Sequence, residues 1–192
     1  MEIMLRVAVP DRPGALASVA EAISERGGDI QAVEVIETAD GTALDDLVVV
    51  VDDERGLAAL LAHLRERDGV EVLHAGPSRG HPGDAVTRMA VGLQAMLDGS
   101  MERDHAVEVL VGGALRARRA TLMPAAEADA DDRAGRDRRL VLPFGTRVLV
   151  LQRDYRFTDT EQHRARALLR LCAVAAGQIG APAPTSASSG WG

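Results

Sequence analysis

The chain has 192 residues, a length that suits one large domain or two small ones. Hydrophobic residues make up 46% and charged residues 27%, which excludes wholesale disorder. The longest uninterrupted apolar runs have six residues, whereas a membrane-spanning helix needs about 20. The net charge of -7 repels nucleic acid and anionic membranes. We therefore expect no nucleic acid and no membrane among the partners of this chain.

Residue types that carry chemistry are sparse. The single cysteine, Cys172, excludes an internal disulfide and a cysteine metal cluster. The five histidines are scattered, and the sequence contains no phosphate loop, nucleophile elbow or dinucleotide fingerprint. The N-terminus has no basic flank followed by a long apolar stretch, so we expect a cytoplasmic protein. We expect no enzymatic activity, no metal and no cofactor.

The first 76 residues show a clear alternation of strand and helix patterns. The turn signals are Gly27-Gly28, Asp40-Gly41 and Asp68-Gly69. The expected elements are a strand at 3–9, a helix at 16–23, strands at 30–37 and 44–51, a helix at 57–64 and a strand at 70–73. The order βαββαβ is that of the ferredoxin-like fold, in which two helices cover one face of a four-stranded antiparallel sheet.

The third strand ends in four consecutive valines, Val48 to Val51, which are apolar on both faces. A sheet covered on one face only is expected to be half polar on the other. Two interpretations remain open. Either this is a strongly β-prone central strand, or its second face is covered by the rest of the chain or by another subunit. From the apolar faces of this strand, and from the family resemblance described below, we predict a homodimer.

A second unit follows a linker at 77–84 that is rich in proline and glycine. The pattern predicts helices around 86–97 and 107–115, strands at 120–123, 140–142 and 147–152, and a final helix. Thr158 and Glu161 form a capping box at the start of that helix. The order is ααβββα, interrupted by a charged stretch at 125–139. We predict an α+β protein with domains at 1–76 and 85–177 and a disordered tail at 178–192.

The segment from Asp11 to Leu16 joins the first strand to the first helix. Asp11 suits an N-cap, Pro13 suits the first helical turn, and Gly14 permits close approach to the backbone. The amides of Gly14, Ala15 and Leu16 would then face outward at the positive end of the helix dipole, where they could bind a carboxylate. The alternative interpretation is a well-capped helix after a tight turn.

This loop, together with Val19 and Ile23 and the later segment Gly27-Gly28-Asp29-Ile30, resembles an ACT domain over about residues 3–75. ACT domains are regulatory modules that commonly pair and bind a free amino acid. The resemblance places the ligand between this loop and the start of the second strand, often between two copies. It points to Asp11, Arg12, Gly14, Ala15, Leu16, Asp29 and Ile30. The family often has asparagine at the position of Asp29, where a carboxylate favours an ammonium group.

The second unit weakly resembles a shortened GAF domain. The resemblance rests on the segments 107–123 and 148–151 and on the sequence from Tyr155 to Glu161. GAF domains are sensing or dimerising modules. Because the part that normally builds the pocket is reduced to the charged stretch at 125–139, the resemblance implies packing and dimerisation.

These observations together predict a non-enzymatic regulatory protein that binds a small amino acid through its ACT-like domain. The alternative is a ligand-free assembly or dimerisation protein that interacts with another regulator or an enzyme. A third interpretation is an accessory subunit of an amino-acid biosynthetic enzyme.

Overall fold

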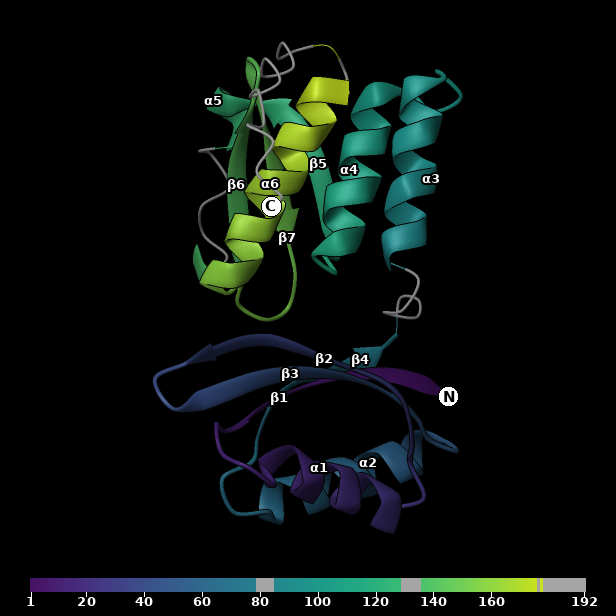
Figure 1. The fold of residues 1–192 in the computed structure, drawn as a ribbon, viewed down its shortest axis with the longest axis vertical. Helices are drawn as coiled ribbons and strands as arrows, with labels where there is room; N and C mark the ends of the chain where they lie inside the picture. Colours follow the sequence, from purple (N-terminus) through teal and green to yellow (C-terminus); the bar gives the residue numbers. More distant parts are fainter. Residues whose placement is uncertain (79–84, 129–135, 176, 178–192) are drawn as a thin grey trace, which may run out of the picture.

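The computed structural model describes residues 1–78, 85–128, 136–175 and 177. Figure 1 shows two modules, one above the other along the long axis. We call residues 1–78 the N-terminal module and the described residues from 85 onward the C-terminal module. Most of the predicted linker and all of the predicted disordered tail lie outside the described residues.

The N-terminal module has the predicted βαββαβ order. Each strand pairs antiparallel with its neighbours in the order β2-β3-β1-β4. The prediction of a ferredoxin-like fold is therefore confirmed for this module. Its elements are β1 (Glu2–Pro10), α1 (Ala15–Glu25), β2 (Asp29–Ala39), β3 (Thr42–Val50), α2 (Glu54–Glu66) and β4 (Glu71–Pro77).

Local sequence explains where these elements begin and end. Asp40 and Gly41 both have positive φ, which is the conformation that a tight hairpin between β2 and β3 requires. The side chain of Asp53 caps α2 by accepting from the amide of Gly56 at 2.8 Å. Gly28 must lack a side chain, because a Cβ there would lie 2.7 Å from Cγ2 of Ile23.

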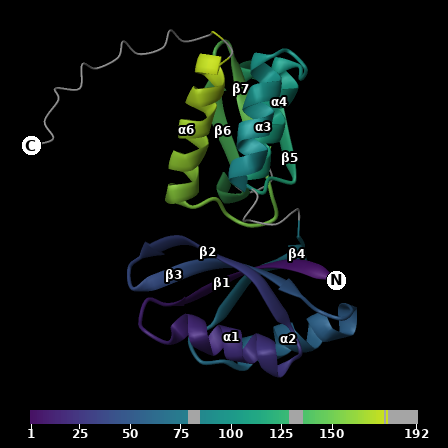
Figure 2. The same ribbon diagram turned by 45° about the vertical axis from the view of Figure 1, so that its right-hand side comes forward.

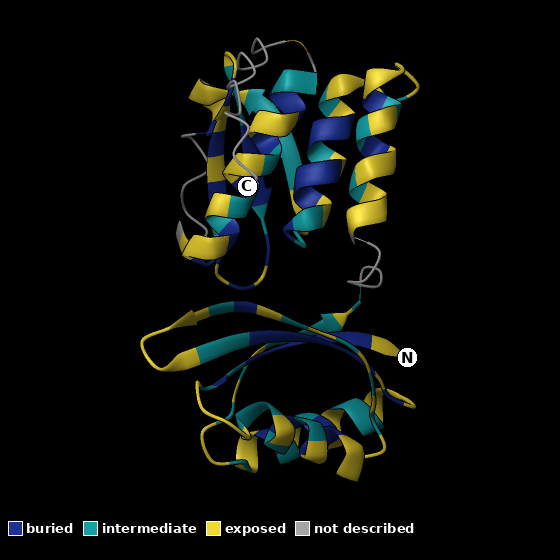
Figure 3. Cartoon of the chain, viewed as in Figure 1, coloured by how far each residue is buried: buried dark blue, intermediate teal, exposed yellow. Residues whose placement is uncertain are grey.

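The core of this module lies between the sheet and its two helices, which cover one face (Figure 2). The dark blue stretches in the middle of the sheet in Figure 3 are buried residues, of which alternate ones belong to this core. Alternate residues of β1 and β3 face the buried sides of α1 and α2, so the period of two seen in the sequence is the period of burial. Its buried members include Leu5, Val7, Val19, Ile23, Leu47, Val49, Leu60 and Leu64.

In the C-terminal module, α4 and α6 pack against one face of an antiparallel sheet of order β5-β7-β6, and α3 packs against these two helices (Figure 2). The predicted ααβββα order is present, with two short helices that the sequence did not predict. Part of the charged stretch at 125–139 lies outside the described residues. The elements are α3 (Ala85–Leu97), α4 (Arg103–Ala114), β5 (Arg119–Pro124), α5 (Ala125–Ala128), the 3-10 helix η3 (Arg136–Arg138), β6 (Arg139–Phe144), β7 (Arg147–Gln152) and α6 (Asp159–Ala175).

The second face of the N-terminal sheet is turned toward the C-terminal module (Figure 1). Met4 and Val48 pair across β1 and β3, and both are buried although neither belongs to the core between sheet and helices. Of the two interpretations of the valine-rich strand, the structure supports a covered second face, and the cover is the C-terminal module. Val50, on the same face as Val48, is 37% exposed. The burial of Val48 within one chain needs no second copy, and the homodimer stays a prediction.

Candidate functional site

The loop between β1 and α1 turns at Gly14, which has a φ of 90°. Gly14 is the N-cap of α1, and no side chain caps the helix. The predicted N-cap, Asp11, instead donates its amide to the carbonyl of Gly41 at 2.8 Å. The prediction of Asp11 as N-cap was wrong, because the left-handed turn at Gly14 delays the helix by three residues.

The start of α1 leaves backbone donors free. The amide of Ala15 donates to the carbonyl of Arg12 at 3.2 Å, so this predicted donor is occupied. The amides of Gly14, Leu16 and Ala17 have no hydrogen-bond partner among the described residues. Free amides at the positive end of a helix dipole bind carboxylates and other anions.

A pocket of about 270 Å³ opens at this loop. Gly14 and Ala15 line it together with the exposed Arg12, so the loop is not filled by its own side chains. Ser18 on α1 and Asp68 in the turn before β4 also line the pocket. The sequence pattern missed both. Ser18 lies one helical turn after Gly14, and its amide donates to the Gly14 carbonyl at 3.0 Å, whereas Asp68 lines the pocket because the turn after α2 lies beside the loop.

The other predicted site residues lie at the far end of the sheet. Asp29 pairs with Val50 at one end of β3. Pro10, just before the loop, pairs with Thr42 at the other end of β3. From Thr42 to Val50 a strand spans roughly 27 Å, at about 3.4 Å per residue. Within one chain the structure therefore does not bring Asp29 and Ile30 together with the loop.

Side-chain placement further separates the predicted residues. Asp11, Arg12 and Asp29 are exposed, and Asp29 accepts a hydrogen bond from the side chain of Gln31. Ala15, Leu16 and Ile30 instead pack against the core of the N-terminal module. The packed residues can offer a ligand only their backbone groups.

A buried ionic network, which the sequence analysis missed, occupies the second face of the sheet. We define it as Arg6, Asp46, Arg153 and Glu161, all of which are at most 5% exposed. Arg6 donates to both oxygens of Asp46 at 2.6 and 2.9 Å. It also donates to Glu161 at the start of α6, at 2.9 Å. The network thus joins the two modules through one guanidinium.

The C-terminal half of this network is equally well satisfied. Arg153 donates to Glu161 at 2.8 Å, and Glu161 accepts from the amide of Thr158 at 2.9 Å. The amide of Glu161 donates to the hydroxyl of Thr158 at 3.1 Å, which confirms the predicted capping box. Burial alone would raise the pKa of the Glu161 carboxyl, but hydrogen bonds from Arg153 and Arg6 outweigh it and lower this pKa to about 2.

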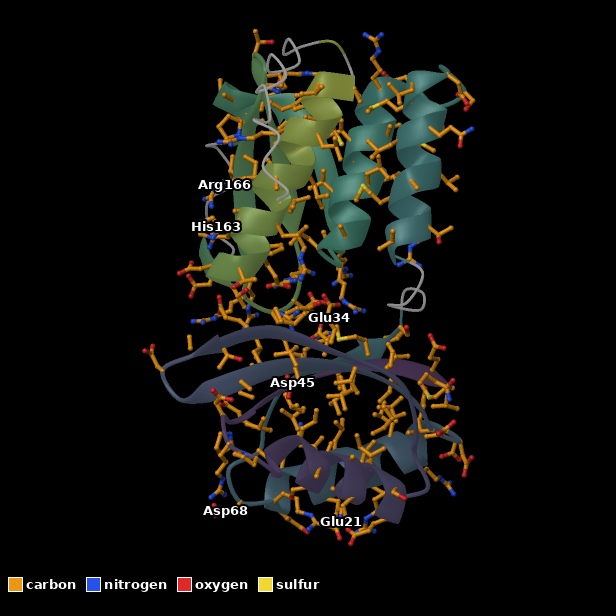
Figure 4. The ribbon with its side chains drawn as sticks, viewed as in Figure 1. Glu21, Glu34, Asp45, Asp68, His163 and Arg166 are labelled. Carbon is orange, nitrogen blue, oxygen red and sulfur yellow. The ribbon has the colours of Figure 1, made fainter. Side chains whose placement is uncertain are left out.

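Further contacts extend the junction between the modules toward its rim. Arg116, at a positive φ of 52°, lies 3.2 Å from Asp46, and Arg164 donates to Glu34 at 2.8 Å. Glu37 accepts from the amide of Thr160 at 3.0 Å. Figure 4 shows Glu34 on the face of the sheet toward the C-terminal module and Asp45 on the face toward the helices.

Among the described residues, no group of three histidine, cysteine, aspartate or glutamate side chains is placed to hold a metal ion. No helix in the described part of the chain has the length and apolar character needed to cross a bilayer.

Residues 3–69 match the family model of the ACT domain. This match confirms the resemblance for the N-terminal module and ends before the C-terminal module, whose likeness to a GAF domain is not shown. No curated protein matches the sequence.

Solved structures similar to the chain include the ACT domain from GTP pyrophosphokinase of Chlorobium tepidum. It is 21% identical, with 40% of this chain and 95% of that chain covered and a TM-score of 0.33. The regulatory subunit of aspartate kinase from Thermus thermophilus in its ligand-free form is 16% identical, with 91% of each chain covered and a TM-score of 0.36. An unknown protein from Galdieria sulphuraria is 12% identical, with 92% of this chain and 93% of that chain covered and a TM-score of 0.34. Identities and TM-scores this low indicate no function for this chain.

Proposed function

We propose that this chain, with an ACT domain at its N-terminus, is a non-enzymatic regulatory protein that binds a small amino acid at the β1–α1 loop. The observation that carries the proposal is the open pocket beside unpartnered amides at the start of α1. These amides suit the carboxylate of an amino acid, and an ammonium group needs acceptors such as a carboxylate or a carbonyl. Asp68, which lines the same pocket, offers one such carboxylate.

In this proposal Asp29 and Ile30 belong to the site of a second copy. They lie at the start of β2, an edge strand of its sheet. Val33 and Val35 on the same strand are 43% and 57% exposed, which leaves apolar surface for a partner. A homodimer formed along this edge could bring the β2 start of one copy near the loop of the other. The C-terminal module, as a shortened GAF-like unit, would then serve packing and dimerisation.

A thermal-shift screen of the full chain against the twenty amino acids tests the proposal. An amino acid at about 100 times its Kd is expected to add about 2.7 kcal/mol to the free energy of unfolding. Gly14→Val is expected to abolish this gain, because its φ of 90° disfavours a β-branched residue and the loop must change shape. Gly99→Val is the matched control: Gly99 has a φ of 77° and, like Gly14, open space around it, but it lies in the C-terminal module.

The alternative function is ligand-free assembly with another regulator or an enzyme. If no amino acid shifts the unfolding of a folded sample, the proposal is wrong and assembly is favoured. If a shift survives Gly14→Val, the binding site lies elsewhere. Light scattering at high concentration tests the homodimer separately, and a monomer there would contradict it.

A further inference from the structure

A cleft lies between the two modules. It has a volume of about 590 Å³, which is within the range of small-molecule sites, and such sites are frequent at domain interfaces. Arg6 of the ionic network forms part of one wall. The sheet face of the N-terminal module and the segments 137–138 and 154–156 of the C-terminal module line it. Any molecule held there would contact both modules.

Carboxylates dominate the charge of this cleft. Asp40, Glu71 and Asp137 line it, and no described residue forms an ion pair with any of the three. Glu37 and Asp154 add two more carboxylates, of which Asp154 is paired with Arg118 at 3.4 Å. Glu37 accepts hydrogen bonds from the amide and the hydroxyl of Thr160. Because both donors are neutral, they do not compensate the negative charge of Glu37.

The cations of the cleft do not balance these carboxylates. The charge of Arg6 is already neutralised by the buried Asp46 and Glu161. This leaves Arg138 and Arg156, which are exposed and have no ion-pair partner among the described residues. The cleft therefore attracts a cation and retains guanidinium groups for a carboxylate on the same ligand.

Apolar groups line the cleft between these charges. Leu73 is 41% exposed, and Ala8 and Leu44 lie beside it on neighbouring strands. Tyr155 is 7% exposed and also lines the cleft. The guanidinium groups of Arg6 and Arg153 lie over its ring, and its hydroxyl is buried without a hydrogen-bond partner among the described residues. An aliphatic chain fits the apolar wall, and the carboxylates of the cleft suit an ammonium group.

We propose that this cleft binds a small ligand that carries an ammonium group on a short aliphatic chain. A free diamine and a basic amino acid share this chemistry, and the arginines favour the latter because they can hold its carboxylate. The site is distinct from the β1–α1 loop, so the inference does not rest on the function proposed for that loop. Because both modules line the cleft, the ligand stabilises their docked arrangement by mass action.

Isothermal titration calorimetry of the full chain with 1,4-diaminobutane, lysine and glutamate, each in turn, tests the inference. We expect binding of the two cationic compounds, weakened by added salt, and no binding of glutamate. The double variant Glu71→Gln/Asp137→Asn is expected to weaken binding at least tenfold. Glu2→Gln, at an exposed carboxylate of β1 outside the cleft, is the matched control and is expected to bind like the parent chain.

Further variants distinguish binding in the cleft from binding at the β1–α1 loop, and a basic amino acid from a free diamine as the ligand. Gly14→Val is expected to leave binding of the cationic compounds unchanged, whereas it abolishes binding at the loop. If lysine binds more tightly than 1,4-diaminobutane and Arg156→Gln removes the difference, the ligand is a basic amino acid. Tighter binding of 1,4-diaminobutane assigns a free diamine. Absence of binding by both compounds, or binding that the double variant leaves unchanged, overturns the inference.

Discussion

The ionic network predicts how stability depends on pH, and Glu161→Gln is the variant that tests it. Glutamine keeps the size and one carbonyl oxygen of Glu161, but it removes the negative charge between Arg6 and Arg153. The carboxyl is 3% exposed, so solvent does not screen these contacts. The variant leaves two buried guanidinium groups with one carboxylate fewer to satisfy them.

The pKa of Glu161 sets the magnitude. Lowering this pKa from 4.5 to about 2 corresponds to about 3 kcal/mol of stability at neutral pH. This agrees with the roughly 3–5 kcal/mol that removal of one partner from a buried ion pair costs. Because the folded-state pKa is the lower one, the contribution is complete above the unfolded pKa of 4.5. It is lost as the pH falls from there toward 2.

Urea denaturation followed by circular dichroism at pH 7, 5, 4 and 3 measures this contribution. Glu161→Gln is expected to lower the free energy of unfolding by about 3 kcal/mol at pH 7, and the difference should narrow below pH 4.5. Glu66→Gln is the matched control, since its side chain is 76% exposed and its loss should cost at most about 0.5 kcal/mol. A difference below about 1 kcal/mol at pH 7, or one that is constant from pH 7 to 3, would refute the reasoning.

Three further predictions concern packing and buried groups. Gly112→Ala is expected to lower the free energy of unfolding by about 1–3 kcal/mol, because the new Cβ would lie 2.7 Å from the Cβ of Ala120. Gly113 has open space around it, so Gly113→Ala is the control and should be neutral or stabilising. Urea denaturation measures both variants. Asp45→Asn is expected to raise the free energy of unfolding at pH 7, because burial, and to a smaller extent the neighbouring carboxylates, raise the pKa of Asp45. This gain in stability should disappear as the pH falls. A loss of stability at pH 7 would contradict the prediction. Burial raises the pKa of the Cys172 thiol to about 11, so a thiol reagent at pH 8 should react with it only at the rate of unfolding, and fast reaction with the native chain would contradict its burial.

The fold of the N-terminal module was predictable because sequence signals that act over a few residues specify its strands, helices and turns. A hydrophobic period of two or 3.6 and a turn pair such as Asp40-Gly41 act over a few residues. The capping box at Thr158 is local in the same way, and the structure confirms it. The N-cap of α1 was predicted wrongly because Asp11 satisfied the composition rule, while the conformation of Gly14 decided where the helix begins.

The ionic network was not predictable because its members are far apart in the sequence. Arg6 alone looks like an ordinary outward-facing residue of an alternating strand, and Glu161 looks like a capping residue. One signal was available: Asp46 stands next to a run of valines in a central strand, where an unpaired carboxylate would be costly. Such a carboxylate requires a cation, but only the three-dimensional arrangement shows that Arg6 and the start of α6 supply it.

The network also decides which surface of the N-terminal sheet remains for a second copy. One face packs on α1 and α2, and the other is fixed to the C-terminal module through Arg6 and Glu161. Among the described residues, the edges of the sheet are β2 and β4. The exposed valines lie on β2, and so does Asp29, which the loop site lacks within one chain. Pairing of two copies along either edge would disturb none of these buried charges, and β2 is the edge that carries these valines and Asp29. In the proposed homodimer, pairing along β2 would therefore bring Asp29 of one copy toward the loop of the other.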